Sequence, residues 1–420
     1  MDALPDNARR RNAWIPAVLV LSACAYVGVA MWINGGTIFR RSLFDYYSLL
    51  ADAVAHGRLW LEGSLRTDDL AVYQGRVYMY WGVSPLAAVA VFHAIGHGFQ
   101  LDVAYTVLLG VANIALFAWM VREAGRALQV DLPPVTRAVV VLLFAFASPN
   151  FYLSMQGRIW HTNQIIATGY FLAFLGFFFR FVHRGRTLDF VIGAVFFHAA
   201  WVARMTYGVA GLLLLYPLQS WTRNRSQALV CLAAAAGLGL AAVAGWAAYN
   251  YVRFAQLTET GYSYMAHSTR FVAGVRSRAL WSTEYLPHNV HYYVFNLPID
   301  WVTGRFKLDL EGNSVLCFYP WTALVPGLTV AWRRVAGQQR PLVWCLSVVS
   351  AIQVAALLTF YATGWTQVGA RYFLDATPIL FVLLLPVLSR VPTAALLALA
   401  TGGAALNLAG MLDFYAIPLR

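Results

Sequence analysis

A carboxylate beside arginines and aromatic residues is the first feature of this sequence that could do chemistry. Asp45 precedes Tyr46 and Tyr47 and follows Arg40 and Arg41. A carboxylate within hydrogen-bond reach of a hydroxyl can take its proton as a general base. Guanidinium groups bind phosphate through paired donors. The segment therefore indicates either acid–base chemistry beside an anionic ligand or, in the simpler interpretation, a capping acid and arginines that contact lipid headgroups.

A second acid follows on what should be the same helix. Asp52 lies seven residues after Asp45, so the two carboxylates would share one face of a helix. Apolar residues make the segment 46–56 amphipathic, which favours a helix lying along the membrane surface. We therefore expect Asp45, with Asp52 nearby, at the surface of a bilayer.

Polar and aromatic side chains recur at the ends of later apolar segments. The arginines there are Arg158, Arg204, Arg253 and Arg371. The other candidates for substrate contacts are Trp81, Trp160, His161, Tyr262 and Asp375. Arg371 and Asp375 are four residues apart, so they could pair on one helical turn. His161 could titrate near neutrality, although a satisfied interfacial histidine is the simpler interpretation.

No metal or nucleotide motif is recognisable. The four cysteines stand in or beside apolar runs without metal-like spacing, and there is no His-Glu-x-x-His pattern. No glycine-rich phosphate loop is present, which argues against a cytosolic nucleotide as donor or fuel. The vicinal pair Asp68–Asp69 could chelate a cation or form a solvated turn. We therefore expect no cofactor, and dependence on a divalent metal stays open.

The composition determines which elements must position these residues. Apolar residues make up 60% of the 420 residues and charged residues 11%, and the mean hydropathy is +0.60. Soluble domains have about 25% charged residues. These values exclude a soluble enzyme, a disordered chain and a coiled coil, and long continuous apolar runs argue against a barrel. An all-α polytopic membrane protein is predicted. Its net charge of +12 indicates contact with anionic lipids rather than nucleic acid.

The apolar runs predict the helices of a single domain over residues 1–420. They cover 14–33, 84–99, 103–121, 138–155, 163–181, 189–203, 207–220, 226–250, 316–332, 341–361, 375–389 and 391–412. The run 84–99 would reach only about 24 Å, less than a hydrocarbon core of about 30 Å, so we expect it not to cross. With that choice, Arg9–Arg11 and the arginine-rich short loops fall on one side.

The resulting topology has about eleven spans, a cytoplasmic N-terminus and two long external segments, 34–102 and 251–315. Residues 14–33 are read as an uncleaved signal-anchor helix. A helix pair with a break near Arg204 fits the charge pattern better than one long helix over 189–220, because arginine is costly in mid-bilayer. The candidate residues then gather on the external side.

The order of these motifs resembles the GT-C superfamily of membrane glycosyltransferases, in particular the aminoarabinose and protein-mannosyl transferases. The resemblance rests on Asp45, Ala51-Asp52-Ala53 with Gly57, the stretch Tyr80 to Pro85, Trp160-His161, Asn250-x-x-Arg253-Phe254 with Gly261-Tyr262, and Gly369-x-Arg371-Tyr372-x-x-Asp375. It covers most of the chain. Ala255 stands where relatives often have glycine, so the subfamily, and with it the sugar, stays open.

The resemblance implies a polyprenyl-phosphate sugar as donor and a glycan, lipid or protein as acceptor. It implies Asp45 as catalytic base and phosphate binding by Arg371, Arg253, Arg204 and Arg158, with Arg40 and Arg58 as further candidates. Tyr46, Trp81, Trp160 and Tyr262 would hold sugar faces. An inverting transferase of a hexose or pentose, with its site on the extracytoplasmic face of a bacterial inner membrane, is expected. The alternatives are a transporter or lipid flippase and a polysaccharide polymerase or ligase.

Overall fold

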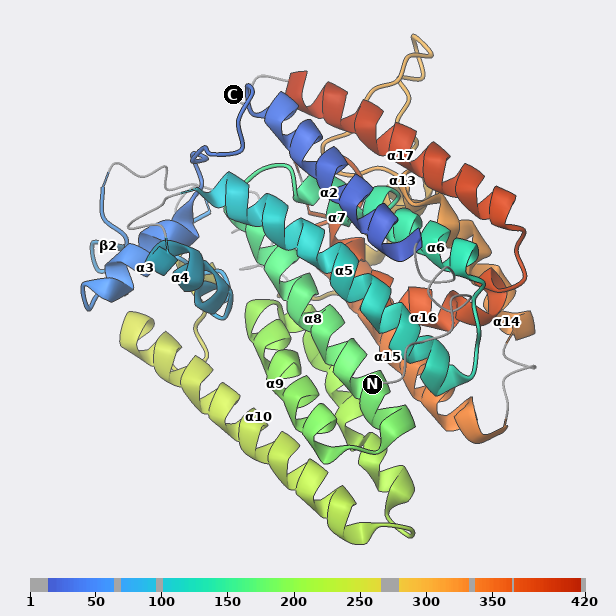
Figure 1. Ribbon diagram of the computed structural model, residues 1–420. Coiled ribbons are helices and arrows are strands. Elements are labelled where there is room, and N and C mark those ends of the chain that lie inside the picture. Colours follow the sequence, from blue (N-terminus) through green and yellow to red (C-terminus); the bar gives the residue numbers. More distant parts are fainter. Residues whose placement is uncertain are drawn as a thin grey trace.

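The computed structural model describes residues 14–63, 69–95, 101–265, 279–331, 337–364 and 366–416. Within these ranges the chain is mostly helical (Figure 1). A two-stranded hairpin, β1 (Ala71–Tyr73) and β2 (Arg76–Tyr78), interrupts it. The predicted all-α class is therefore confirmed. Arg9–Arg11 and Asp68 lie outside the described residues.

Most helices follow the predicted apolar segments, but two predicted runs are broken. The run 138–155 divides into one helix that ends at Phe146 and another that starts at Pro149, and the run 316–332 divides into three short helical pieces. The first half contains α2 (Trp14–Ile33), α3 (Tyr46–Ala55), α4 (Pro85–Ile95), α5 (Asp102–Leu128), α6 (Pro134–Phe146), α7 (Pro149–Leu153), α8 (Ile159–Arg184), α9 (Thr187–Ala203), η1 (Met205–Ser220) and α10 (Arg225–Phe254). Short helical turns follow at η2 (Tyr262–Tyr264), η3 (Thr283–Tyr285), α12 (Leu286–Val290) and η4 (His291–Phe295). The last part contains α13 (Val315–Phe318), η5 (Pro320–Gly327), α14 (Leu328–Ala331), η7 (Gly337–Gln339), α15 (Arg340–Thr359), η8 (Arg371–Asp375), α16 (Thr377–Leu388) and α17 (Thr393–Ala416).

Six of the described helices are long and apolar enough to cross a membrane, namely α2, α5, α8, α10, α15 and α17. The helices α4, α6, α9 and α16 are apolar but shorter. The chain is thus a polytopic membrane protein, and the number of eleven spans stays a prediction. The short helix α4 packs against α3 at one end of the bundle (Figure 1).

The predicted break beside Arg204 is confirmed. The helix α9 ends at Ala203, and Arg204 has the extended dihedrals φ −145° and ψ 116° before η1 begins. The loop at Gly82 crosses this helix end so closely that a Cβ there would lie 2.3 Å from the Ala203 carbonyl oxygen. The Ala203 carbonyl, which accepts from the Asn163 side chain (3.3 Å), and the closely packed loop at Gly82 mark this break between α9 and η1.

Buried polar side chains connect the central helices. Asn113 of α5 donates to Asn150 Oδ1 (3.1 Å) and to the Ile165 carbonyl of α8 (2.9 Å). Asn150 in turn donates to the Tyr26 hydroxyl, which donates to the Ala145 carbonyl. Inside a membrane, hydrogen bonds between helices of this kind help to fix their packing. These hydrogen bonds hold α2, α5, α7 and α8 together.

The candidate residues gather where α2, α9, α10 and α15 finish and α5 and α8 begin, and we call this the polar end. The helices α3 and α4 and the hairpin lie there too (Figure 1). The opposite end holds the start of α2, the end of α5 and the start of α6.

Candidate active site

Asp45 is buried at the start of the surface helix α3, where it is 2% exposed. Its Oδ1 accepts hydrogen bonds from the Ser48 backbone N–H (3.2 Å) and from the Tyr105 hydroxyl (3.0 Å). The first bond is a helix N-cap, a position that aspartate favours. Within the described part of the chain its Oδ2 is buried and accepts no hydrogen bond, and this oxygen forms an ion pair with Arg41.

The environment of Asp45 suits a base. Burial raises the pKa of the Asp45 carboxyl, and the neighbouring Ser48, Arg41 and Tyr105 partly offset this. The Arg41 Nε lies 3.4 Å from Oδ2 and its side chain is 40% exposed. A carboxylate with a raised pKa binds a proton more strongly than a solvated one, provided that it is ionised.

Asp102 is a second acid that the sequence analysis did not identify. It is fully buried at the start of α5, accepts a 2.7 Å hydrogen bond from the Ser42 N–H and another from the Ser42 hydroxyl, and lies within electrostatic reach of Asp45. The sequence feature that could have identified Asp102 is an acid at the first position of a long apolar helix. Asp102 ties the segment carrying Asp45 to a spanning helix.

Gly157 is required for this arrangement. A Cβ at Gly157 would lie 2.3 Å from Cγ and 2.5 Å from Oδ2 of Asp102, and the Ser42 hydroxyl oxygen lies 3.0 Å from the Gly157 carbonyl oxygen. We expect Gly157→Ala to lower the free energy of unfolding by about 2 kcal/mol through overpacking. Thermal denaturation in detergent measures this. Gly237→Ala, where a Cβ meets nothing within 4 Å, should leave the melting temperature unchanged or raised, and equal melting temperatures for the two variants would contradict the packing argument.

Two arginines and a histidine form a buried basic cluster at the polar end. The backbone N–H of Ile159 donates to the Phe44 carbonyl (3.1 Å). Arg158 directly precedes Ile159 and Asp45 directly follows Phe44, so this hydrogen bond joins the two backbone segments that carry them. Arg158 is 4% exposed, Arg371 6% and His161 0%. The charges of both arginines act on His161 and on each other.

The basic cluster has unused donors. Within the described residues, Arg158 Nη1, the Nε and Nη1 of Arg371 and both ring nitrogens of His161 have no hydrogen-bond partner, and neither arginine forms an ion pair. The Nη2 of Arg371 donates to the Gly364 carbonyl. The hydroxyls of Tyr152 and Tyr415, which feel the charges of Arg371 and Arg158, are also unpartnered there. Buried unpaired cations are costly, so this geometry favours a bound anion.

The predicted pairing of Arg371 with Asp375 is wrong. Asp375 is fully buried and pairs with Arg204, whose Nη2 and Nε lie 2.8 and 3.0 Å from Oδ2. Thr206 (2.6 Å) and Gln164 (3.1 Å) complete the contacts of this carboxylate. Because Asp375 pairs with Arg204, it does not occupy the donors of Arg371, whose Nε and Nη1 have no partner among the described residues. Arg204 therefore serves to hold the 371–375 turn.

An aromatic cavity of about 120 Å³ lies next to this ion pair. Its walls include Trp81, Tyr262 and Tyr372, with Arg204 at one side. The Tyr372 ring lies between two cations, with the guanidinium carbons of Arg204 and Arg371 5.1 and 5.0 Å from its centroid. The further aromatic residues of the wall are Tyr80, Trp246, Trp281 and Phe360. The predicted residues Trp81 and Tyr262 thus come together, adjacent to the basic cluster.

The remaining candidates occupy other positions. Arg253 donates to the Met79 carbonyl, Asn250 and the Tyr249 carbonyl and stacks on the Tyr249 ring, so its hydrogen bonds are used inside the fold. Tyr46 is buried against Phe44. Trp160 is 8% exposed and packs on Phe44, with its ring centroid 4.9 Å away.

Asp45 and Asp52 have different surroundings. Asp45 precedes the helix as its cap, whereas the Asp52 side chain is 46% exposed and lies 3.7 Å from His56. Of the weaker arginine candidates, Arg58 pairs with Glu62, and Arg40 donates to the Asn34 carbonyl (3.3 Å). Among the described residues, no group of three or more His, Cys, Asp or Glu side chains is placed to hold a metal.

Comparisons with known proteins give structural relatives only. No protein-family model and no curated protein sequence matches the chain. ArnT from Cupriavidus metallidurans, solved bound to undecaprenyl phosphate, is similar with a TM-score of 0.53 and 13% identity over 96% of this chain and 76% of that one. The Archaeoglobus fulgidus oligosaccharyltransferase in its apo form has a TM-score of 0.52 and 13% identity over 95% of this chain.

The oligosaccharyltransferase AglB from Archaeoglobus fulgidus, solved in complex with an inhibitory peptide and a dolichol-phosphate, has a TM-score of 0.53 and 13% identity over 96% of this chain. The chain spans 56% of the length of these archaeal proteins. At this identity the likeness concerns the arrangement of the helices. The chain is therefore a polytopic membrane protein with a GT-C-like fold.

Proposed function

We propose that the chain is a glycosyltransferase that moves a sugar from a polyprenyl-phosphate carrier to an acceptor. The observation that carries this proposal is the buried basic cluster, in which Arg158, Arg371 and His161 have nitrogens without a partner among the described residues, and in which Arg158 and Asp45 flank the backbone hydrogen bond between Ile159 and Phe44. A phosphate would satisfy these donors and balance the charge. The polyprenyl phosphates bound to ArnT and AglB support this class of ligand.

The chemistry follows from the positions of the residues. Asp45 takes the proton of the acceptor hydroxyl as that oxygen attacks the anomeric carbon. The bond from this carbon to the phosphate oxygen breaks, and its electron pair leaves with the polyprenyl phosphate. Arg158 and Arg371 stabilise the negative charge that grows on the departing phosphate in a site with little water. One displacement inverts the anomeric centre.

The sugar would lie between base and arginines, against the aromatic cavity. Trp81, Tyr262 and Tyr372 offer ring faces to it. The prenyl tail would leave toward lipid, past Phe39 and Leu43, which are 68% and 65% exposed. The proposal includes an acceptor from the cell envelope, which is a glycan, a lipid or a protein. It also places the active site on the extracytoplasmic side of a bacterial inner membrane. The extracytoplasmic orientation is supported by the arginines Arg122, Arg126 and Arg137 at the opposite end of the bundle.

The test is incubation of purified protein with a panel of polyprenyl-phosphate sugars and candidate acceptors, with polyprenyl phosphate measured by mass spectrometry. A transferase releases the free phosphate together with a glycosylated acceptor. A flippase moves the intact donor across vesicles without releasing it, and this result would contradict the proposal. A polymerase or ligase would instead show growth or transfer of a long glycan.

The environment of Asp45 also predicts a pH dependence. Because the base must be ionised and burial raises its pKa, the rate should fall on the acidic side at a pH above that expected for a solvated aspartate. Arg41 lowers this pKa, so Arg41→Gln should raise it and move the acidic limb of kcat/KM to higher pH. Arg40→Gln, whose guanidinium contacts the Asn34 carbonyl, is the matched control. An acidic limb that stays in place or moves to lower pH in Arg41→Gln would exclude Asp45 as the titrating base.

A further inference from the structure

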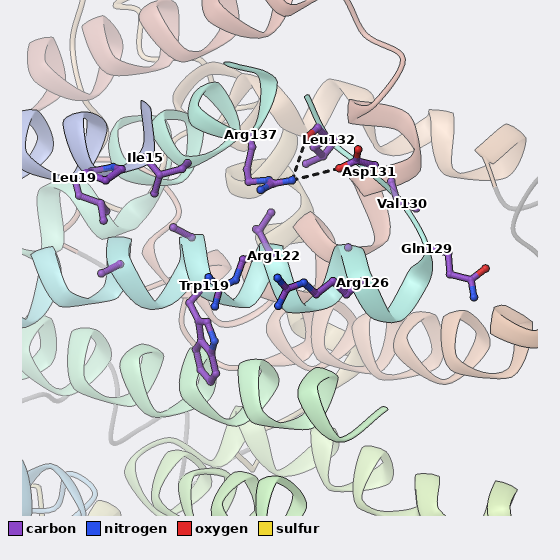
Figure 2. Close-up of a pocket in the computed structure, with 15 residues that line it drawn as sticks. Ile15, Leu19, Trp119, Arg122, Arg126, Gln129, Val130, Asp131, Leu132 and Arg137 are labelled. Carbon is purple, nitrogen blue, oxygen red and sulfur yellow. Dashed lines mark hydrogen bonds and ion pairs between the residues drawn. The ribbon is translucent and has the colours of Figure 1, made fainter. Parts of the chain in front are cut away.

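A cavity larger than the aromatic one lies at the opposite end of the bundle, far along the helices from Asp45. It has a volume of about 720 Å³ and is enclosed by the start of α2, the second half of α5 and the start of α6. Figure 2 shows Arg122 and Arg126 on α5 with Arg137 of α6 facing them and Ile15 and Leu19 of α2 to one side. The proposed transfer reaction does not use this cavity.

Its polar side is positively charged. Glu123 is buried and holds Arg122 (3.0 Å) and Arg126 (3.1 Å) side by side on α5. His183 of α8 bonds to the other oxygen of Glu123 (2.7 Å), so this carboxylate is fully occupied. The side chains of Arg122 and Arg126 remain about half exposed, with exposed fractions of 48% and 49%.

Arg137 adds a third guanidinium, which is repelled by Arg122 and Arg126. Its acidic partner Asp131, 3.4 Å away, has a side chain that is 97% exposed, so water screens that attraction. Three arginines thus face one cavity that also contains one solvated acid. A ligand with a negative charge would relieve their mutual repulsion.

The other side of the cavity is apolar and runs along the helices. Ile15 and Leu19 of α2 face the small residues Ala115 and Ala118 of α5. From Ala115 to Arg126 the helix rises about 16 Å, so an apolar groove of roughly that length ends at the arginines. The arginines stand in the last turns of α5 and the first turn of α6, where a spanning helix meets lipid headgroups.

We propose that this cavity binds an anionic phospholipid of the surrounding leaflet, with its phosphate on Arg122, Arg126 and Arg137 and one acyl chain between α2 and α5. Charge complementarity selects the headgroup, and the apolar groove selects an amphiphile over a free phosphate. The arginines bind a phosphodiester through forked donors, as Arg does at other phosphate sites. The lipid would fix α2, the helix that leads to Asp45, against the bundle.

Native mass spectrometry tests the proposal with the full-length protein in detergent, titrated with phosphatidylglycerol or phosphatidylcholine. We expect phosphatidylglycerol to bind about tenfold more tightly to the wild type, and the double variant Arg122→Gln/Arg137→Gln to lose this preference. The control Arg186→Gln/Arg390→Gln removes two exposed arginines at the same end and should keep the preference. Equal losses in both doubles, or no preference in the wild type, would overturn the proposal. Inorganic phosphate should not compete at similar concentration, and competition by it would indicate an anion site without a lipid groove.

A second measurement needs only the unaltered chain, so it holds even if the double variant does not fold. Phosphatidylglycerol with a photoreactive group in the middle of one acyl chain should label peptides of α2 around Ile15–Leu19 and of α5 around Ala115–Trp119. Labelling spread over the outer faces of α10 and α15, without enrichment at these peptides, would overturn the proposal.

Discussion

Asp45→Asn is expected to lower the rate of sugar transfer by about a thousandfold, because the acceptor hydroxyl loses its base. Asparagine caps helices as well as aspartate, so the Ser48 contact and the start of α3 should survive. Donor affinity should therefore remain within a few fold of the wild type, since the basic cluster is untouched. Single-turnover transfer and equilibrium binding of the donor measure the two quantities separately.

Asp52→Asn is the matched control, because this acid is half-exposed on the same helix and pairs with His56 at the surface. It should transfer sugar at the rate of the wild type. If Asp45→Asn also keeps that rate, the assigned base is wrong and Asp102 becomes the residue to test, since it is the other buried acid of this region.

Removal of the basic cluster is expected to weaken donor binding by about a hundredfold for Arg371→Ala and by a similar factor for Arg158→Ala, because each removes a buried charged donor from the phosphate. Arg158 is the more informative position. Its side chain makes no hydrogen bond with the described residues, so the variant should fold normally. Isothermal titration with a polyprenyl phosphate in detergent gives the affinity.

Two further variants make this experiment specific. Arg371→Lys keeps the charge but loses the forked geometry and should recover part of the affinity. Arg58→Ala removes an arginine that pairs with Glu62 near the surface and should bind as the wild type does. Unchanged affinity in both Arg158→Ala and Arg371→Ala would remove the basic cluster from the donor site.

The helices of this protein could be predicted from sequence because long apolar runs have few alternatives in a bilayer. The run 14–33 is α2 to the residue, and the break at Arg204 follows from the cost of placing a guanidinium in mid-membrane. Ala255, placed where relatives often have glycine, adopts the left-handed conformation (φ +54°) that ends α10. Local chemistry determines such features, so local sequence reveals them.

The partners within the site could not be predicted in the same way. Arg371 and Asp375 are close in sequence, but Asp375 meets Arg204, 171 residues away, because η1 and the 371–375 turn pack together. Asp102 was missed since its role depends on Ser42 and Gly157, which approach it from two other segments. The polar residues at the helix ends were recognisable, whereas their pairing depends on the three-dimensional packing.

The central claim is that Asp45 and the basic cluster share one donor site. A structure of the protein with a bound polyprenyl phosphate, determined by electron cryomicroscopy, tests it most directly. We expect phosphate density at hydrogen-bond distance, about 3 Å, from the guanidinium groups of both Arg158 and Arg371, with the Asp45 carboxylate facing the same space. Phosphate density among Arg122, Arg126 and Arg137 at the opposite end, with the basic cluster left empty, would contradict it.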